Sequence, residues 1–225
     1  MPTNISGASL RRLPQYMKVL SQLSEEMKAY VTSAELARRL QLDETLVRKD
    51  LAITGFTGKP RVGFSVNNLL LHLEGFLGLR NTKEAFLIGA GRLGQALADY
   101  PGFEKYGLRI VALFDTDQLK IGQIIAGKEV MPLWKAPALA RSLNVRIAIL
   151  TVPPQCAQAV ADLLVEAGIL ALWNFSGQPL TIAEPAIVQA EDLAESLSVL
   201  SHRLARQMEQ HPTLFVPNEL QIDVR

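Results

Sequence analysis

The sequence has few of the side chains on which many enzymes and secreted proteins rely. It contains a single cysteine, Cys156, which excludes an intramolecular disulfide and indicates a reducing compartment. None of its three histidines (His72, His202 and His211) follows an apolar segment that could form a strand. No cluster of His, Cys and Asp has the spacing of a metal site, so we expect no metal. The acid or base that a hydride-transfer enzyme places beside its cofactor is also missing, so we expect no enzyme.

Long hydrophobic runs are absent as well. No apolar stretch approaches the roughly 18 residues that span a bilayer, and residues 1–13 lack the apolar core of a secretory signal. We therefore expect a soluble, cytoplasmic protein with no membrane partner. The chain has 225 residues, 48% of them hydrophobic, which is enough for one or two packed domains.

The charges are unevenly distributed along the chain. Residues 1–80 carry 11 Lys and Arg against 7 Asp and Glu, whereas residues 81–225 carry 12 against 15. A basic first third joined to a mildly acidic remainder is typical of a nucleic-acid-binding module attached to a ligand domain. Ordinary scatter of surface charge is the alternative.

Helical spacing of apolar residues predicts a DNA-binding domain over residues 1–80. It predicts helices over 10–27 and 65–78, a helix capped by Thr32 or Ser33 and ending near Gln41, and a helix capped by Asp43. The two shorter helices form a helix-turn-helix, and a basic, glycine-flanked turn at 58–63 follows as a wing.

The third helix is the predicted recognition helix. Val47 and Leu51 face inward, so Thr45, Arg48 and Lys49 face outward, where they can reach guanine edges or phosphates. Each such residue taken alone is more often a solvated surface charge. The predicted DNA-binding residues are Arg11, Arg12, Ser33, Thr45, Arg48, Lys49, Lys59 and Arg61.

After residue 81 the pattern changes to apolar strands alternating with helices. Runs at 85–88, 108–114, 147–152 and 171–175 predict an α/β domain over 81–189 with a Rossmann-like, doubly wound parallel sheet. The first run leads into a G-x-G-x-x-G loop at residues 89–94, and Asp115 ends the next strand 21 residues after Gly94. This context is that of a dinucleotide-binding fingerprint.

The fingerprint predicts NADH or NAD+ as the ligand. Asp115 would accept hydrogen bonds from the adenosine ribose and repel a 2′-phosphate, which favours NAD(H) over NADP(H). Residues 151–153, at the end of the third apolar run, and 174–175, at the end of the fourth, would contact the ribose and nicotinamide, because ligands of such sheets lie at the carboxyl ends of strands. Coenzyme A, another nucleotide or no ligand are the alternatives. The predicted cofactor-binding residues are Gly89, Ala90, Gly91, Arg92, Leu93, Gly94, Asp115, Thr151, Val152, Pro153, Asn174 and Phe175.

Two further features lie near the C-terminus. Cys156 falls in the first turn of a helix and is expected to be a small buried residue, with a reactive thiol beside the cofactor as the alternative. Apolar residues at helical spacing predict an amphipathic helix over 190–208, within a segment assigned to 190–210. Residues 211–225 are predicted to be an extended tail.

Several motifs resemble the Rex family of redox-sensing transcriptional repressors. They are RLPQY (12–16), VRKDL (47–51), GFTG (55–58), GFSV (63–66), the glycine loop, LADYPGF (97–103), FDTD (114–117), LTVP (150–153), AGI (167–169) and NF (174–175). The similarity covers residues 10 to about 205.

The resemblance implies a homodimer with N-terminal winged helices, C-terminal Rossmann domains and a last helix exchanged between subunits. Such a dimer binds inverted-repeat operator DNA, represses anaerobic and fermentative genes and is released by NADH, while NAD+ competes weakly or favours the DNA-bound form. It also implies an inter-subunit switch that involves Lys18, Tyr100 and Asp192. Because this switch would report the state of the nicotinamide, the resemblance adds Tyr100 to the predicted cofactor-binding residues.

Two other functions are compatible with parts of the sequence. One is a small NAD-dependent dehydrogenase with a helical N-terminal cap, against which the absent acid or base argues. The other is a coenzyme-A-binding or structural Rossmann subunit with no role on DNA, against which the Arg and Lys residues of the helix and wing argue.

Overall fold

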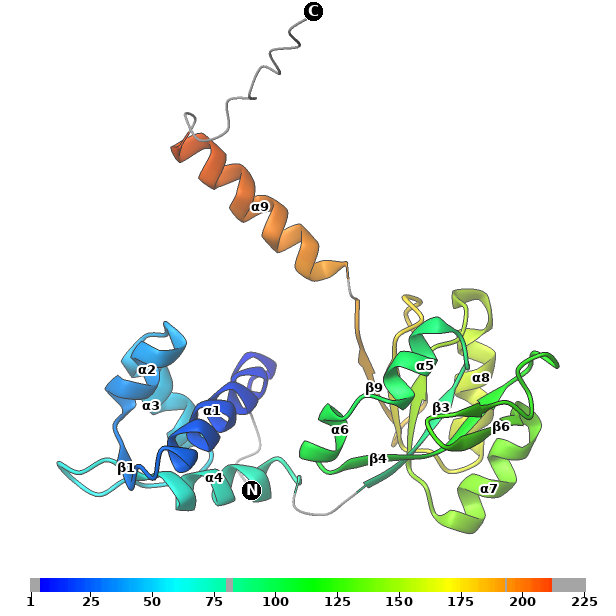
Figure 1. Cartoon of the computed structure of the whole chain (residues 1–225), viewed down its shortest axis with the longest axis horizontal. Helices are drawn as coiled ribbons and strands as arrows, with labels where there is room; N and C mark the ends of the chain where they lie inside the picture. Colours follow the sequence, from blue (N-terminus) through cyan, green and yellow to red (C-terminus); the bar gives the residue numbers. More distant parts are fainter. Residues whose placement is uncertain (1–4, 80–82, 193, 212–225) are drawn as a thin grey trace, which may run out of the picture. The chain divides into compact units, whose positions relative to one another are not determined.

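The computed structural model describes residues 5–79, 83–192 and 194–211 (Figure 1). The chain divides into two compact units. The first comprises Met1–Thr82 together with Gly102–Leu108, and the second comprises Lys83–Pro101 together with Arg109–Arg225. Each unit has its own hydrophobic core.

The first unit contains four main helices, each preceded by a polar residue at its N-cap. They are α1 (Gly7–Glu25), α2 (Ser33–Leu40), α3 (Glu44–Ile53) and α4 (Val66–Phe76), and the short α6 (Gly102–Lys105) belongs to the same unit. Side chains of Ser6, Thr32 and Asp43 accept backbone N–H bonds at the starts of α1, α2 and α3. Thr32, one of the two candidates, is therefore the cap of α2.

The helices pack through apolar faces at the predicted spacing. Leu20 of α1, Leu36 of α2, Val47 and Leu51 of α3 and Leu69 of α4 are all fully buried in one core. Gln41 adopts a left-handed conformation (φ 54°) directly after α2, which ends that helix and lets α3 start at Glu44. The predicted helix-turn-helix is thereby formed.

A small antiparallel sheet completes this unit. Strand β1 (Tyr30–Val31) pairs with β2 (Phe64–Ser65), and the turn from Lys59 to Gly63 is closed by two backbone hydrogen bonds of 2.8 and 2.9 Å. Gly63 has φ +104°, and a Cβ there would collide with the carbonyl oxygen of Val31. The unit is therefore a winged helix.

The second unit is built on a seven-stranded sheet with the order β5-β6-β4-β3-β7-β8-β9. The pairs β3–β7, β4–β6, β7–β8 and β8–β9 are parallel, and β5–β6 is antiparallel. The strands are β3 (Lys83–Ile88), β4 (Leu108–Asp115), β5 (Ile124–Ile125), β6 (Lys128–Pro132), β7 (Ile147–Leu150), β8 (Ala171–Asn174) and β9 (Ile187–Ala190).

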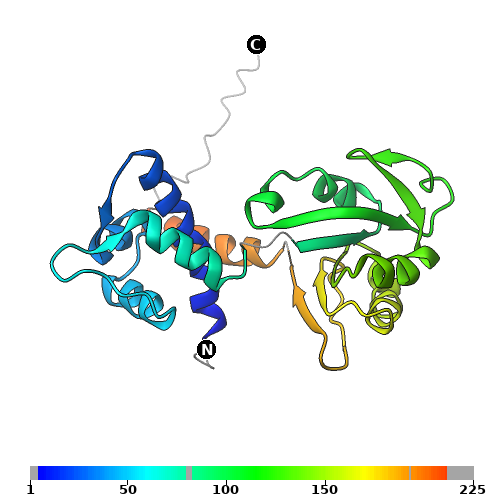
Figure 2. The ribbon, with the colours of Figure 1, turned by 90° about the horizontal axis from the view of Figure 1, so that it is seen from below.

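Helices cover both faces of this sheet. Figure 2 shows α5 (Arg92–Ala98) on one side and α7 (Ala136–Leu143) with α8 (Pro154–Glu166) on the other. Residues 85–88 of β3 and 110–114 of β4 form continuous apolar runs, as expected for central strands with both faces covered. The chain leaves β3 toward β4 and later returns to β7 on the other side of β3, so the strand order reverses at the carboxyl ends of β3 and β7. Ligands of open α/β sheets bind at this place.

The structure corrects the predicted C-terminal helix. Ala190 pairs with Asn174 as the last residue of the edge strand β9, and α9 (Glu195–Gln210) begins five residues later. The β-branched pair Ile187 and Val188 favours a strand, and β9 pairs with the edge of β8 up to Ala190, so the helix starts later than the spacing of its leucines predicted. The predicted tail lies, from residue 212 onward, outside the described residues.

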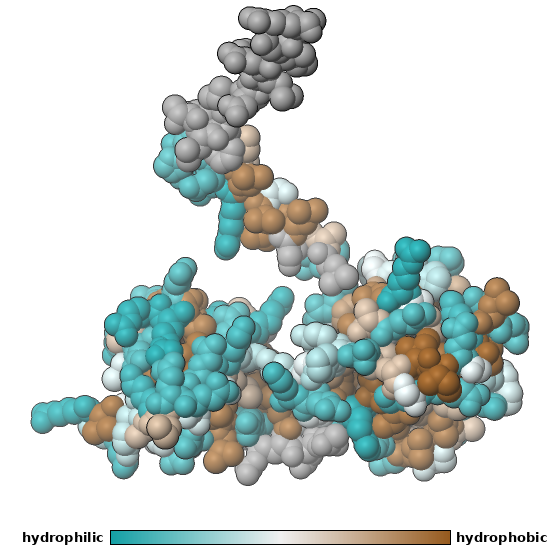
Figure 3. Space-filling view, in the orientation of Figure 1, coloured by the Kyte–Doolittle hydropathy of each residue, from teal (hydrophilic) through white to brown (hydrophobic). Residues whose placement is uncertain are grey.

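Helix α9 carries a row of exposed apolar side chains, which Figure 3 shows along its length. Leu197, Leu200 and Leu204 are 60%, 61% and 50% exposed. In the part of the chain that the structure describes, no helix combines the length and apolar character needed to cross a bilayer.

Candidate functional site

The glycine loop connects β3 to α5 in a conformation that only glycine permits at two of its positions. Gly89 has φ +102°, and a Cβ there would lie 2.7 Å from the carbonyl oxygen of Thr151. A Cβ on Gly94 would collide with the carbonyl oxygen of Gly89. At Gly91, in contrast, a Cβ would meet no atom within 4 Å. Gly89 and Gly94 are therefore required by the fold, whereas Gly91 leaves open space beside the loop.

Thr151, directly after β7, holds the loop against the neighbouring strand. Its Oγ1 lies 2.7 Å from the carbonyl oxygen of Gly89 and 3.0 Å from that of Ile88. The hydroxyl thus bridges two consecutive carbonyl groups at the point where the strand order reverses. It orients the loop from the sheet side.

Asp115, the last residue of β4, is the most heavily hydrogen-bonded side chain of the site. Its Oδ2 accepts from the backbone N–H of Ala90 (2.7 Å) and from Nζ of Lys120 (3.2 Å). Its Oδ1 accepts from the backbone N–H groups of Thr116 (2.8 Å) and Asp117 (2.9 Å). Burial alone would raise the pKa of Asp115, but the bonds from Asp117, Ala90 and Lys120 outweigh burial and lower it. Asp115 is therefore a buried carboxylate that ties the glycine loop to the loop after β4.

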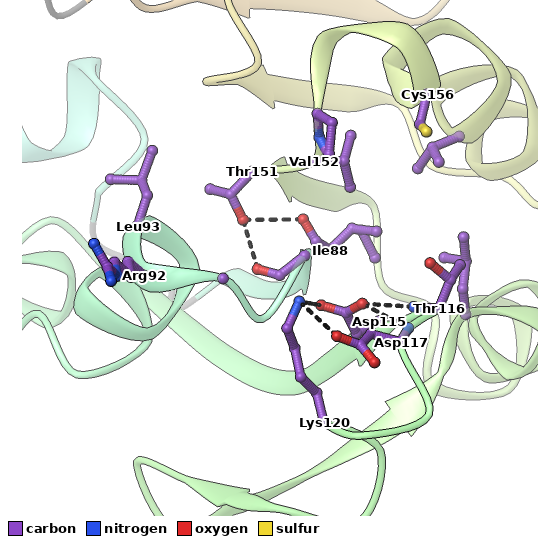
Figure 4. A pocket seen from close by; sticks show the side chains of 15 residues that line it. Ile88, Arg92, Leu93, Asp115, Thr116, Asp117, Lys120, Thr151, Val152 and Cys156 are labelled. Carbon is purple, nitrogen blue, oxygen red and sulfur yellow. Dashed lines mark hydrogen bonds and ion pairs between the residues drawn. The ribbon is translucent and has the colours of Figure 1, made fainter.

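A cavity of about 530 Å³ lies at the carboxyl ends of β3, β4 and β7 (Figure 4). Its volume is typical of a site for a small ligand. Most of the residues predicted to bind the cofactor line this cavity. They are Gly89, Gly91, Arg92, Leu93, Asp115, Thr151, Val152 and Pro153.

Sequence reasoning missed two charged residues of the cavity, Asp117 and Lys120. Nζ of Lys120 lies 3.5 Å from Oδ2 of Asp117, in addition to its contact with Asp115. The pKa of Lys120 is raised, chiefly by its hydrogen bond to Asp115. The Asp-x-Asp-x-x-Lys spacing after the strand was the available signal, since it places all three side chains in one tight loop.

Cys156 also lines the cavity and is exposed, so the expectation of a buried cysteine was wrong. It is the third residue of α8, and the next residue, Ala157, is the one that is fully buried in the core. The first turn of α8 therefore presents the thiol to the cavity.

Five predicted cofactor residues do not line the cavity. Ala90 and Gly94 belong to the glycine loop itself, where the N–H of Ala90 bonds to Asp115 and Gly94 packs against the carbonyl oxygen of Gly89. The other three come from later segments. Asn174 is 2% exposed, and its side chain bonds to Ser176 and to the carbonyl oxygen of Gln178, so it organises the loop after β8. The ring of Phe175 packs against Trp173 at a centroid distance of 5.1 Å. Tyr100 follows α5 and is 56% exposed.

The recognition helix α3 presents its predicted polar face to solvent. Thr45, Arg48 and Lys49 are exposed, and Arg48 forms a 3.0 Å ion pair with Glu44 one turn earlier. This pair leaves the Arg48 side chain 61% exposed. The outward face of α3 is thus polar and accessible at Thr45, Arg48 and Lys49.

The wing residues Lys59 and Arg61 are exposed, as is Arg11 on α1. Nζ of Lys59 lies 3.1 Å from the hydroxyl of Tyr30 and over its ring, which orients the lysine at the base of the wing. Arg61 has a positive φ of 62° at the tip of the turn.

Two residues predicted to contact DNA make contacts inside the winged helix instead. The guanidinium of Arg12 binds the buried carboxylate of Asp50, and the hydroxyl of Ser33 lies 2.9 Å from Oε1 of Glu44. The side chain of Arg12 is only 19% exposed. The arginine is turned inward because Asp50, on the buried face of α3, requires a partner.

The three residues assigned to a switch lie on or beside three different helices. Lys18 is exposed on α1, and Tyr100 follows α5. Asp192 precedes α9 instead of lying on it, and its Oδ1 accepts the N–H of Ala194 at 2.8 Å. Its predicted position on the last helix was wrong because β9 occupies the residues before it.

Comparison with known proteins gives consistent results for both units. A model of a putative DNA-binding protein N-terminus matches residues 4–52, and a model of a CoA binding domain matches residues 80–177. The redox-sensing transcriptional repressor Rex of Treponema denticola is 42% identical over 195 residues, which cover 87% of this chain and 93% of the relative. The Rex repressor of Chloroflexus aurantiacus is 40% identical over 200 residues, covering 89% and 94%.

Solved structures of a Rex-family repressor are also similar to this chain. RSP, a Rex-family repressor, in complex with β-NAD+ and operator DNA is 35% identical with a TM-score of 0.86, covering 94% of this chain and 97% of that one. RSP in complex with β-NADH is 34% identical with a TM-score of 0.84, covering 94% and 99%. With a winged helix, a Rossmann-like domain and this degree of identity over most of its length, the chain belongs to the Rex family of redox-sensing transcriptional repressors.

Proposed function

We propose that this protein is a repressor that binds operator DNA as a homodimer and leaves it when NADH occupies the cavity beside the glycine loop. The observation that carries the proposal is the presence, in one chain, of an exposed recognition helix and a dinucleotide-type cavity. RSP, similar to this chain over 94% of its length, has been solved with operator DNA and β-NAD+ and with β-NADH.

The cavity suits a nicotinamide dinucleotide. The open space at Gly91 lets a pyrophosphate approach the backbone, whose N–H groups are the donors for its oxygens. The carboxylates of Asp115 and Asp117 give the loop after β4 a negative charge where the adenosine ribose would lie. This charge favours the ribose hydroxyls of NADH and disfavours the 2′-phosphate of NADPH.

The nucleotide is sensed and not consumed. The polar side chains that line the cavity are Arg92, Asp115, Thr116, Asp117, Lys120, Thr151 and Cys156. No histidine is among them, and the acidic and lysine side chains are engaged with one another at the adenosine end. We therefore assign the protein no catalytic activity and a cytoplasmic location, where NADH and DNA are both present.

DNA would be contacted by the exposed face of α3 and by the wing. Arg48, Lys49 and Thr45 would enter the major groove, while Lys59, Arg61 and Arg11 would contact phosphates. The inward-facing Arg12 and the Glu44-bonded Ser33 would support this surface from behind.

The apolar row on α9 provides the dimer contact. Three leucines at least half exposed on one helix are an unusual surface for a free monomer, and a second copy that exchanges this helix would bury them. Two linked winged helices could then bind two half-sites of an inverted repeat. Truncation after residue 190 should yield monomers in light scattering; a stable truncated dimer would contradict the exchange.

The experiment is an anisotropy titration of a fluorescent inverted-repeat operator, selected from a DNA library, in the presence of NADH or NAD+. NADH is expected to weaken operator binding, and NAD+ is expected to weaken it less or not at all. Operator binding that is identical with and without NADH would contradict the proposal. Steady oxidation of NADH by an added carbonyl substrate would instead favour a dehydrogenase.

A further inference from the structure

The carboxylate of Asp115 has no free position for a ribose hydroxyl. A carboxylate offers about four lone-pair sites. Backbone N–H groups of Ala90, Thr116 and Asp117 occupy three of them, at 2.7–2.9 Å, and Nζ of Lys120 occupies the fourth, at 3.2 Å. The three amides are fixed by the chain, so Lys120 is the donor that can leave. A hydroxyl can bond to Asp115 only where Lys120 now sits.

Lys120 has a second carboxylate within reach. Its Nζ already lies 3.5 Å from Oδ2 of Asp117, whose side chain is 42% exposed against 9% for Asp115 (Figure 4). The ammonium can therefore move from Asp115 to Asp117 and keep an ion pair throughout. The cost of vacating Asp115 is small because both carboxylates lie on one short loop.

The same ammonium also sets the charge that a ribose phosphate meets. Two carboxylates and one ammonium carry a net charge of −1, whereas the two carboxylates alone would carry −2. A phosphate monoester carries nearly two negative charges at neutral pH. Lys120 thus roughly halves the repulsion that the loop exerts on a 2′-phosphate, while it competes with an unmodified ribose for Asp115.

We infer that Lys120 is a specificity-determining residue that limits the preference of this site for NADH over NADPH. It acts in opposite directions on the two nucleotides, because it competes with the ribose hydroxyl of one and attracts the phosphate of the other. The inference rests on the proposed function, since it assumes that the adenosine ribose binds at this loop.

The test compares dissociation constants of NADH and NADPH, measured by nucleotide fluorescence with the full chain. Lys120→Met should leave NADH affinity unchanged or higher and weaken NADPH about five- to tenfold, the effect of one uncompensated charge a few ångströms away in a partly solvated site. The ratio of the NADPH to the NADH dissociation constant should therefore rise in Lys120→Met. In Asp117→Asn this ratio should fall by a similar factor, because a negative charge is removed. Higher salt should reduce the changes in this ratio in both variants, because it screens the interaction between the loop charges and the phosphate.

Two controls separate this role from others. Lys128→Met removes the same charge from β6, where Nζ bonds to the carbonyl oxygen of Ala126 outside the cavity, and should leave the ratio unchanged. Lys120→Arg keeps the charge and should keep the ratio close to that of the unmodified protein. Thermal unfolding of each variant checks that the fold is intact.

An unchanged or reduced preference for NADH in Lys120→Met would overturn the inference. So would an equal loss of both nucleotides, because it would make Lys120 a direct contact of either ligand. Asp117→Asn tests the charge argument independently, since it leaves the Lys120–Asp115 pair in place. Failure of the proposed function can be distinguished from failure of this inference, because it would appear as the absence of NADH binding to the unmodified protein.

Discussion

Arg12 of α1 forms a two-point contact with Asp50 of α3: Nε lies 2.6 Å from Oδ2 and Nη2 lies 2.8 Å from Oδ1. The hydroxyl of Tyr16 donates to the same Oδ2 at 2.6 Å, and Asp50 is 2% exposed. Asp50 lies on the same helix as Arg48 and Lys49 but on its buried face. The contact therefore fixes the rotation of the recognition helix about its axis.

Replacing Arg12 should destabilise the winged helix, although the sequence predicts a DNA contact for this arginine. Arg12→Ala leaves Asp50 as an unpaired buried charge and should lower the free energy of unfolding by about 3 kcal/mol. Arg11→Ala removes the same charge from the adjacent exposed position and should change it by less than about 0.5 kcal/mol. Chemical denaturation of both variants measures these free energies of unfolding. Equal, small changes in the two variants would show that the Arg12–Asp50 contact does not anchor α3.

The same pair predicts a dependence of stability on pH. Burial would raise the pKa of Asp50, but the bonds from Arg12 and Tyr16 outweigh burial and lower it. The unfolded chain, with an ordinary Asp pKa near ~3.9, then takes up the proton first as the pH falls. The stabilisation is fully present above that pKa and is lost as the pH falls toward the lower folded value.

Asp50→Asn provides the measurement. The difference in unfolding free energy between the unmodified protein and this variant should be largest at pH 6–7 and shrink below about pH 4. Urea denaturation at both pH values isolates this residue from the other carboxylates, because those are common to the two proteins. A difference independent of pH would contradict the assigned pKa shift.

Gly91 and Gly94 should respond differently to the same substitution. Gly94→Ala places a Cβ against the carbonyl oxygen of Gly89 and should destabilise the second unit. Gly91→Ala meets no atom within 4 Å, so stability should change by less than about 1 kcal/mol, while NADH binding should weaken at least about tenfold because the methyl group fills the space for the pyrophosphate. Thermal unfolding and NADH titration give the two readouts. Normal NADH affinity in Gly91→Ala would place the pyrophosphate elsewhere.

Much of this site could be predicted from the sequence because it depends on local signals. The glycine loop, the acid that ends β4 and the residues after β7 all follow strands whose apolar pattern is clear, and parallel strands bring their carboxyl ends together. The caps Thr32 and Asp43 were identifiable for the same reason, since a cap acts on the next three residues.

The rest depends on contacts between distant segments. Arg12 and Asp50 are 38 positions apart, and nothing local shows that this arginine faces inward. The short edge strand β9 forms by pairing with the edge of β8, a contact between separate segments. The leucine spacing of α9 predicted a helix from residue 190 and gave no sign of this strand. Asp117 and Lys120, in contrast, lie on the same loop as Asp115, and the Asp-x-Asp-x-x-Lys spacing was a local signal for them that the sequence analysis did not use.

Arg48 and Lys49 should carry sequence recognition. Each single alanine substitution is expected to weaken operator binding by about 1–3 kcal/mol where the side chain contacts a base edge. Lys59→Ala on the wing should weaken binding to all sequences and reduce the salt dependence, as expected of a phosphate contact. Arg141→Ala, on the exposed face of α7, serves as the charge-matched control. Operator affinity that is unchanged in the Arg48, Lys49 double variant would exclude α3 as the recognition helix.

The nucleotide cavity and the DNA-binding surface are expected to be energetically coupled. NADH can release DNA only if it binds the DNA-free arrangement more tightly than the DNA-bound one. The most direct test is the NADH affinity of the protein measured with and without saturating operator DNA. Operator should weaken NADH binding by the same factor by which NADH weakens operator binding, between about 5- and 150-fold. Equal NADH affinities in the two conditions would contradict it, even if both ligands bind.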